Sequence, residues 1–190
     1  MHSTERTAKP HAHQTAGNPF GLFPEQVGFV VAAHAEKPRK PENATRRWDG
    51  RTPYAAHPIW CATMLMTESS LPEDLRSVGC QVLLLHDIVE DTTAELPESV
   101  SPEVEALVRE MTFPGGTREE VQEVWLRSDR CKLFKLYDKV SNCLDGAAFS
   151  DERWNQYSAY TLRLADFVES KWGPLHIVRI ARLICQPRRP

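Results

Sequence analysis

The segment LLLHDIVEDT, residues 83–92, places an apolar run directly before a cluster of polar and charged side chains. Three consecutive leucines lead into one histidine and three acids. These four groups are His86, Asp87, Glu90 and Asp91. Because the two parts adjoin, the element that buries the leucines also carries the charges inward, and burying them without compensation would cost many kcal/mol. The fold must therefore supply compensating positive charge at this point.

The length and charge of the chain narrow the class of protein. The 190 residues suit one domain, and a hydrophobic content of 41% is enough for a core. A net charge of −3 and an isoelectric point near 6.2 give no global field that would attract nucleic acid or anionic membrane. We therefore expect no nucleic-acid partner and no membrane partner, and the sequence leaves the oligomeric state open.

The sequence also indicates a cellular compartment. The N-terminus lacks the apolar stretch of a signal peptide, and no run reaches the roughly 20 apolar residues of a membrane span. The cysteines are odd in number, widely spaced and without a CxxC pair, which indicates reduced, buried thiols. They are Cys61, Cys80, Cys131, Cys143 and Cys185. We expect a cytoplasmic protein.

Hydrophobic spacing predicts helices throughout the chain, with no convincing strand pattern. Ser101 followed by Pro102 is a strong helix start, and a break is expected near Ser128. Helices are predicted over residues 25–37, 57–69, 71–92, 101–113, 118–144, 151–173 and 174–185. The predicted fold class is all-α, with a flexible arm over residues 1–22, one domain over 23–186 and a polar tail over 187–190.

Helical spacing brings the four groups after the leucines to one side of about two turns, where a divalent cation is the simplest compensation. Two further ligands must come from elsewhere, and His34 and Asp138 are the candidates. From spacing alone, a helical ion pair of Asp138 with Lys135 or Lys139 is favoured over a metal ligand. His57 precedes Pro58, and we expect it to fix the start of a helix through a backbone hydrogen bond rather than to bind metal.

Four segments in order resemble the hydrolase domain of RelA/SpoT-type alarmone enzymes, a branch of the HD phosphohydrolases. HDIVEDT, residues 86–92, is similar to the family's HDxxEDT. AHAEKPR (33–39), GRTPYAAHP (50–58) and KLYDKVSN (135–142) are similar to its AHxxQxR, GxPYxxHP and KLxDKxxN. The resemblance spans about residues 25–145, and the small single-domain alarmone hydrolases, the metazoan-type SpoT homologues, have a similar size.

The resemblance implies an HD-type helical bundle and a set of site residues. The family's metal ligands fall on His34, His86, Asp87 and Asp138, and its metal is usually manganese (Mn2+). Its catalytic acids fall on Glu90 and Asp91. Its substrate contacts fall on Asn142 and, with weaker similarity, on Arg153 and Tyr157.

The sequence departs from the family pattern around His34. Lys37 stands where the family has glutamine, and FPEQVGF upstream of His34 has no basic residue where the alarmone enzymes hold the base. The loop that follows is longer than usual and rich in cations. These cations are Lys37, Arg39, Lys40, Arg46, Arg47 and Arg51. They form either a phosphate clamp, with Lys37 and Arg39 as candidate substrate-binding residues, or an ordinary solvated loop.

The implied activity is metal-dependent removal of the 3′-pyrophosphate from (p)ppGpp, a small phosphorylated nucleotide. A second interpretation keeps the metal and changes the substrate to another phosphorylated nucleotide or cofactor, such as NADPH. A third is a catalytically silent nucleotide-binding protein.

Overall fold

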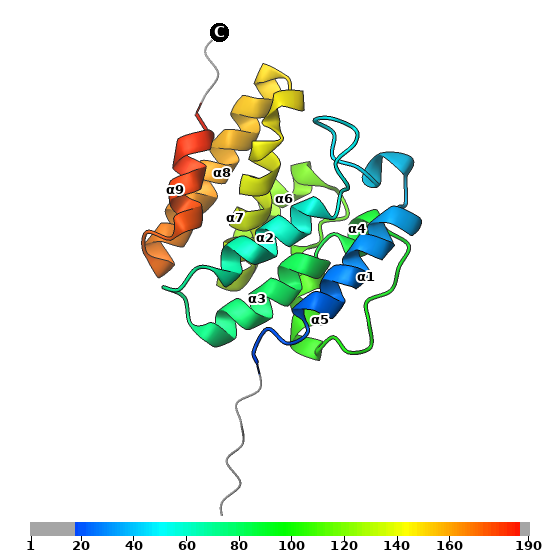
Figure 1. The fold of residues 1–190 in the computed structure, drawn as a ribbon. Coiled ribbons are helices and arrows are strands. Elements are labelled where there is room, and N and C mark those ends of the chain that lie inside the picture. The colour runs from blue at the N-terminus through cyan, green and yellow to red at the C-terminus, as the bar shows by residue number, and fades with distance from the viewer. Residues whose placement is uncertain (1–17, 187–190) are drawn as a thin grey trace, which may run out of the picture.

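The computed structural model describes residues 18–186, and this part of the chain is almost entirely helical (Figure 1). Its α-helices are α1 Phe23–Glu36, α2 Ala56–Met66, α3 Glu73–Leu85, α4 Ile88–Asp91, α5 Pro102–Met111, α6 Thr117–Glu123, α7 Asp129–Leu144, α8 Asp151–Trp172 and α9 His176–Ile184. Short 3-10 helices are η1 Pro41–Asn43, η2 Val124–Leu126 and η3 Gly146–Ala148. Within the described range, β pairing is limited to two isolated bridges. The all-α prediction is confirmed.

The sequence predicts a flexible arm at the N-terminal end, residues 1–22, and a polar tail at the C-terminal end, residues 187–190. Residues 1–17 of the arm and the tail over 187–190 lie outside the described residues. Phe20, within the predicted arm, packs against the main hydrophobic core. The domain boundaries at 23 and 186 therefore stay predictions.

Helix α7 runs through the middle of the fold (Figure 1). It contacts α2 and α3 on one side and α8 and α9 on the other, and every residue from Cys131 to Ser141 is buried. The polar face of this helix, which carries Lys135, Asp138 and Lys139, is buried as well as its apolar face. Glu120 on α6 pairs with both lysines, and His57 on α2 lies 3.4 Å from Asp138.

Helix starts follow the local sequence signals. The Ser101 hydroxyl accepts a hydrogen bond from the Val104 amide at 3.3 Å, as its capping position predicts. Ser128 caps α7 in the same way, accepting from the Cys131 amide at 3.1 Å. The predicted break near Ser128 is therefore confirmed, since η2 ends at Leu126 and Ser128 caps the start of α7.

The helix predicted over 71–92 is interrupted, so that prediction was wrong in one respect. Helix α3 ends at Leu85, and the backbone of Asp87 turns to φ −88° and ψ −7° before α4 begins. The main-chain amide of Asp91 donates to the carbonyl of Asp87 at 2.8 Å and closes the next turn. The turn changes the direction of the chain between the leucines and the acids, so the apolar part stays in the core while the carboxylates reach a pocket.

None of the helices in residues 18–186 combines the length and the apolarity that crossing a bilayer requires.

Two helical glycines give a matched test of the packing. A Cβ added at Gly79 on α3 would collide with the side chains of Leu65 on α2 and Phe134 on α7, whereas a Cβ at Gly28 on α1 would meet nothing within 4 Å. We expect Gly79→Ala to lower the free energy of unfolding by about 1–3 kcal/mol despite the better helix propensity of alanine. Gly28→Ala should leave it unchanged or raise it by up to about 1 kcal/mol. Urea unfolding measures both, and equal effects would contradict the close approach at Gly79.

Candidate metal centre and active site

Two histidines and two aspartates converge at the buried floor of a pocket. One ring nitrogen of His57, one of His86 and one carboxylate oxygen of Asp138 lie within 4.8 Å of one another. Asp87 adds its carboxylate, with Oδ1 3.1 Å from His86 Nε2 and Oδ2 3.4 Å from His57 Nε2. Helices α2 and α7 and the turn between α3 and α4 supply these groups. The opening segment, residues 83–92, thus meets its expected partner Asp138.

The ring nitrogens at this cluster fit a divalent cation. Nε2 of His57, Nε2 of His86 and both ring nitrogens of His34 are buried without a hydrogen-bond partner. The Nδ1 of His86 lies 2.8 Å from the Leu83 carbonyl oxygen, which can only accept. Nδ1 therefore carries the proton, and Nε2 presents its lone pair toward the carboxylates. Unpartnered nitrogens beside two carboxylates are the donor set that a transition-metal ion would satisfy.

Burial also sets the protonation of the histidines. Loss of hydration lowers the pKa of His57 and the pKa of His34 from their ordinary values, so both favour the neutral form that metal binding requires. His34, near the end of α1, stacks on the ring of Tyr54 with centroids 4.8 Å apart. It lies beside the compact cluster rather than within it. Its role as a ligand stays a prediction.

The expectation for His57 was wrong. Its side chain does not cap α2; Nδ1 lies 2.8 Å from the Ser141 hydroxyl, and Nε2 faces Asp87 and Asp138. A sequence signal was available, because His57 shares a helical face with Cys61 and therefore has to point into the core. A buried histidine needs polar partners, and here those partners are the candidate metal ligands.

Asp138 takes part in both of the arrangements that its spacing allowed. Its Oδ2 lies 3.2 Å from the Lys135 ammonium and 3.1 Å from that of Lys139, while Oδ1 accepts from Asn142 at 2.7 Å and lies 3.4 Å from His57 Nε2. Burial alone would raise the pKa of Asp138, but the two lysines hold it well below its ordinary value. The carboxylate is therefore ionised and available to a cation.

Glu120 on α6 completes this charge network and was missed at the sequence level. Its Oε2 lies 2.8 Å from the Lys139 ammonium and 3.3 Å from that of Lys135, and its Oε1 accepts from the Tyr160 hydroxyl at 3.0 Å. Two buried lysines thus share two buried carboxylates. No short-range motif marks Glu120, because its partners lie on another helix.

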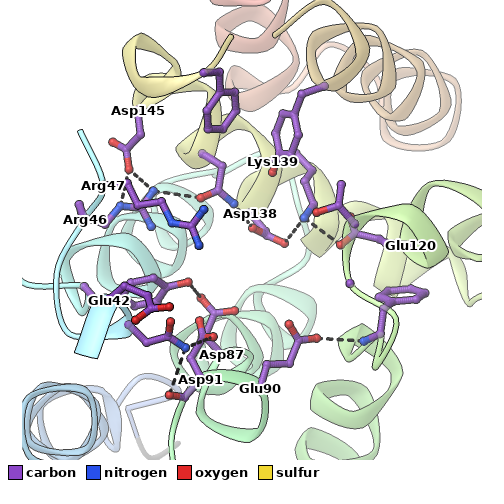
Figure 2. A pocket seen from close by; sticks show the side chains of 18 of the residues that line it. Glu42, Arg46, Arg47, Asp87, Glu90, Asp91, Glu120, Asp138, Lys139 and Asp145 are labelled. Atoms are coloured by element: carbon purple, nitrogen blue, oxygen red, sulfur yellow. Dashed lines mark hydrogen bonds and ion pairs between the residues drawn. The ribbon is translucent and has the colours of Figure 1, made fainter. Parts of the chain in front are cut away.

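Glu90 and Asp91 both border the pocket (Figure 2). Glu90 accepts from the Phe113 amide at 2.9 Å, and Asp91 accepts from the Asn43 side chain at 2.6 Å. Burial, followed by the charge of Asp87, raises the pKa of Asp91 to about 7. Burial also raises the pKa of Glu90. Asp91 is thus adjusted toward proton exchange near neutral pH, and the pKa of Glu90 is shifted in the same direction.

The predicted substrate-binding residues divide into two groups. Asn142, Arg153 and Tyr157 line the pocket, whereas Lys37 and Arg39 do not. The reason is hydrogen bonding to α4 and to the residue two positions after it. The Arg39 amide donates to the Asp91 carbonyl at 2.8 Å and its guanidinium to the Val89 carbonyl at 3.2 Å, while the Thr93 amide donates to the Lys37 carbonyl at 2.9 Å.

Arg46, from the same loop, reaches the pocket. It pairs with Asp145 and donates to the Asn142 side-chain oxygen at 3.0 Å (Figure 2). The family motif AHxxQxR aligns its arginine with Arg39. In this longer loop, however, it is Arg46 that reaches the pocket wall facing α7. The side chain of Tyr54, below Arg46, donates to Asp87 Oδ2 at 2.9 Å and orients that carboxylate.

Comparisons with known proteins were made on sequence and on structure. No family model matches the sequence. A human protein named guanosine-3′,5′-bis(diphosphate) 3′-pyrophosphohydrolase MESH1 is 32% identical over 143 residues, 70% of this chain and 74% of its own length. The Drosophila melanogaster protein of that name is 28% identical over 162 residues, 78% of this chain and 85% of its own length.

A solved structure is also similar. It is described as a metazoan ortholog of SpoT that hydrolyses ppGpp and plays a role in starvation responses. The two structures align with a TM-score of 0.65 and 25% identity, covering 89% of this chain and 96% of that one.

The position of His57 leads to a metal-binding prediction. We expect His57→Ala to weaken manganese binding by at least about tenfold, because the residue either binds the ion or orients Asp87 and Asp138. His176→Ala, at an exposed histidine on α9, is the matched control and should not change the affinity. Competition with a fluorescent chelator measures both dissociation constants, and an unchanged constant for His57→Ala would remove His57 from the centre.

The raised pKa of Asp91 leads to a stability prediction for the chelator-treated, metal-free protein. A folded-state pKa of about 7 against an ordinary value of 3.8 means that the native state favours protonated Asp91. This contribution is fully present below about pH 4 and is lost as the pH rises through 7. Asp91→Asn should therefore become more stable than the parent chain by about 1–3 kcal/mol at pH 8, with little difference near pH 4.5.

Asp49 supplies a control of opposite sign. Hydrogen bonds from the Arg51 and Thr52 amides lower the pKa of this exposed carboxyl group, so its contribution is present at neutral pH and lost in acid. Asp49→Asn should thus be destabilising at pH 8. Urea unfolding across pH 4.5–8.5 tests both substitutions, and a pH-independent difference for Asp91→Asn would contradict the shift.

Proposed function

Because the chain belongs to the family of MESH1 guanosine-3′,5′-bis(diphosphate) 3′-pyrophosphohydrolases, we propose that it removes the 3′-pyrophosphate of ppGpp and pppGpp. The family assignment rests on the human relative, which is 32% identical over 70% of this chain. One structural observation carries the functional proposal. Asp87 and Asp138, which lie against the ring nitrogens of His57 and His86, line the same pocket as two carboxyl groups of raised pKa, Glu90 and Asp91.

We propose manganese as the ion. The resemblance assigns His34, His86, Asp87 and Asp138 as ligands, and the geometry adds His57 as a candidate. Mixed imidazole and carboxylate donors suit manganese among other divalent ions. When bound, such an ion lowers the pKa of a coordinated water and neutralises charge on a phosphoryl oxygen.

The other residues would handle protons and substrate. Glu90 and Asp91 can divide two tasks between them, accepting a proton from the attacking water and delivering one to the leaving 3′ oxygen. Asn142, Arg153 and Tyr157 line the same pocket and would contact the nucleotide. Lys135 and Lys139 lower the pKa of Asp138 and keep this carboxylate ionised near neutral pH.

A second candidate function is hydrolysis of another phosphorylated nucleotide or cofactor, such as NADPH. The observation that favours it is the composition of α1. No lysine or arginine occurs between Phe23 and Glu36, although the resemblance leads us to expect basic residues for the guanine base in the turns before His34. A silent binding protein is the third possibility, and it requires that no substrate is turned over.

We also propose a cytoplasmic location. All five cysteines are buried and unbridged, which fits a reducing compartment.

The deciding experiment is a product assay on a panel of phosphorylated nucleotides. The panel holds ppGpp, pppGpp, NADPH and simple nucleotides, each with manganese and with a chelator. Manganese-dependent pyrophosphate release from the first two supports the proposed function. Orthophosphate from NADPH alone would transfer the same chemistry to the second candidate, and no release from any compound would favour the silent binder.

Glu90 gives a direct test of catalysis. Glu90→Gln preserves size and removes the carboxylate, so we expect manganese content to stay intact while turnover of ppGpp falls at least about a hundredfold. Glu95→Gln, the same change at an exposed glutamate after α4, is the matched control and should keep full activity. Metal analysis and steady-state kinetics measure the two properties, and full turnover by Glu90→Gln would reject its assignment.

A further inference from the structure

The pocket walls are short of positive charge for a polyanionic substrate. Among the described residues, five cationic side chains and seven carboxylates line them. The cations are Arg46, Arg47, Lys135, Lys139 and Arg153, and the carboxylates are Glu42, Asp87, Glu90, Asp91, Glu120, Asp138 and Asp145. A metal ion offsets the excess at the floor of the pocket. Substrate phosphate groups that lie farther from the floor of the pocket need a cation that is not already paired with a carboxylate.

Three of the five cations already form ion pairs with carboxylates. Arg46 pairs with Asp145, while Lys135 and Lys139 lie within 3.3 Å of Glu120 and within 3.2 Å of Asp138. All three are buried. Moving Arg46 to a substrate phosphate would take the cation from the half-buried Asp145, and moving either lysine would leave two buried carboxylates with one ammonium group between them, which is costly.

Arg47 is exposed and forms no ion pair with a carboxylate of the described residues. Within residues 18–186 no carboxylate lies within 4 Å of its guanidinium, and Figure 2 shows its side chain extending into the open part of the pocket. Arg153, the remaining cation, comes from α8 and packs over the ring of Phe149 at 4.3 Å from its centroid. Arg47 and Arg153 therefore come from two different walls, the loop 37–55 and α8.

The main chain next to Arg47 is held in place. The Arg46 amide donates to the Thr52 carbonyl at 2.8 Å, and the Gly50 amide donates to the Arg46 carbonyl at 3.0 Å. Thr45 and Pro53 form a bridge, and the buried Arg46 side chain fixes the loop to α7 through Asp145. Arg47 thus extends from an anchored position, which lowers the entropy lost when its guanidinium binds an anion.

We propose that Arg47 binds the phosphate group of the substrate that is not hydrolysed, the 5′-diphosphate of the alarmone, and so selects substrates that carry it. This inference rests on the proposed function. The reacting 3′ group has to lie at the buried cluster beside Glu90 and Asp91, so the opposite end of the nucleotide points outward. Arg47 is exposed on that outer side, and a guanidinium can bind two phosphate oxygens at once.

The test uses three guanosine 3′-diphosphates that carry a 5′-diphosphate, a 5′-monophosphate or a 5′-hydroxyl. With Arg47→Ala, we expect KM for the 5′-diphosphate compound to rise about ten- to hundredfold, with kcat within about twofold, because the contact is present in both the bound substrate and the transition state. KM for the 5′-hydroxyl compound should change less than about twofold. Arg47→Lys should restore part of the loss.

Arg51→Ala is the matched control, because Arg51 is an exposed arginine of the same loop that does not line the pocket. It should leave all three KM values unchanged. An equal loss on all three substrates with Arg47→Ala would overturn the selective role, and so would no loss on any, while parent activity on ppGpp would still support the proposed function. If the parent chain hydrolyses none of the three, the proposed function fails, and the role of Arg47 fails with it.

Discussion

The arrangement of the pocket depends on one buried carboxylate, Asp138, and on the charges that surround it. An unpaired aspartate at the centre of a helical fold would be protonated or expelled. Two lysines on its own helix prevent this by pairing with the carboxylate. Glu120 on α6 neutralises the one positive charge of the two lysines that Asp138 does not balance. α7 can therefore pass through the core with a polar face buried. The remaining oxygen of Asp138 is then positioned toward the histidines.

Sequence reasoning recovered the parts of the structure that local chemistry determines. The cap at Ser101 and the break near Ser128 follow from residues within one turn of each other. His86, Asp87 and Asp138 were identified from spacing and from family resemblance, and the structure brings them together. In each of these cases the informative residues are close in sequence or belong to a motif.

What could not be predicted depends on contacts between distant segments. Glu120 carries no signal of its own, because its meaning depends on two lysines of another helix. The interruption after Leu85 follows from where the pocket lies, which no helical periodicity encodes. Arg46 rather than Arg39 faces the pocket because hydrogen bonds to the main chain of α4 hold Arg39 away from it. His57 was misjudged because its partners, Asp87 and Asp138, come from two later segments.

The central position of α7 divides the pocket into two parts with different freedom to change. Residues on α7 share the cooperative stability of the core, so their amide hydrogens should exchange only when the whole domain unfolds. The loop 37–55 borders the same cavity and has fixed and free positions: Asn43 donates to Asp91, Tyr54 donates to Asp87 and Arg46 pairs with Asp145, whereas Arg47 is exposed. Substitutions at the exposed positions of this loop, such as Arg47, would alter which nucleotide is recognised at little cost to folding. In evolutionary terms, the range of substrates can change through the exposed loop residues while the residues of the hydrolytic site are retained.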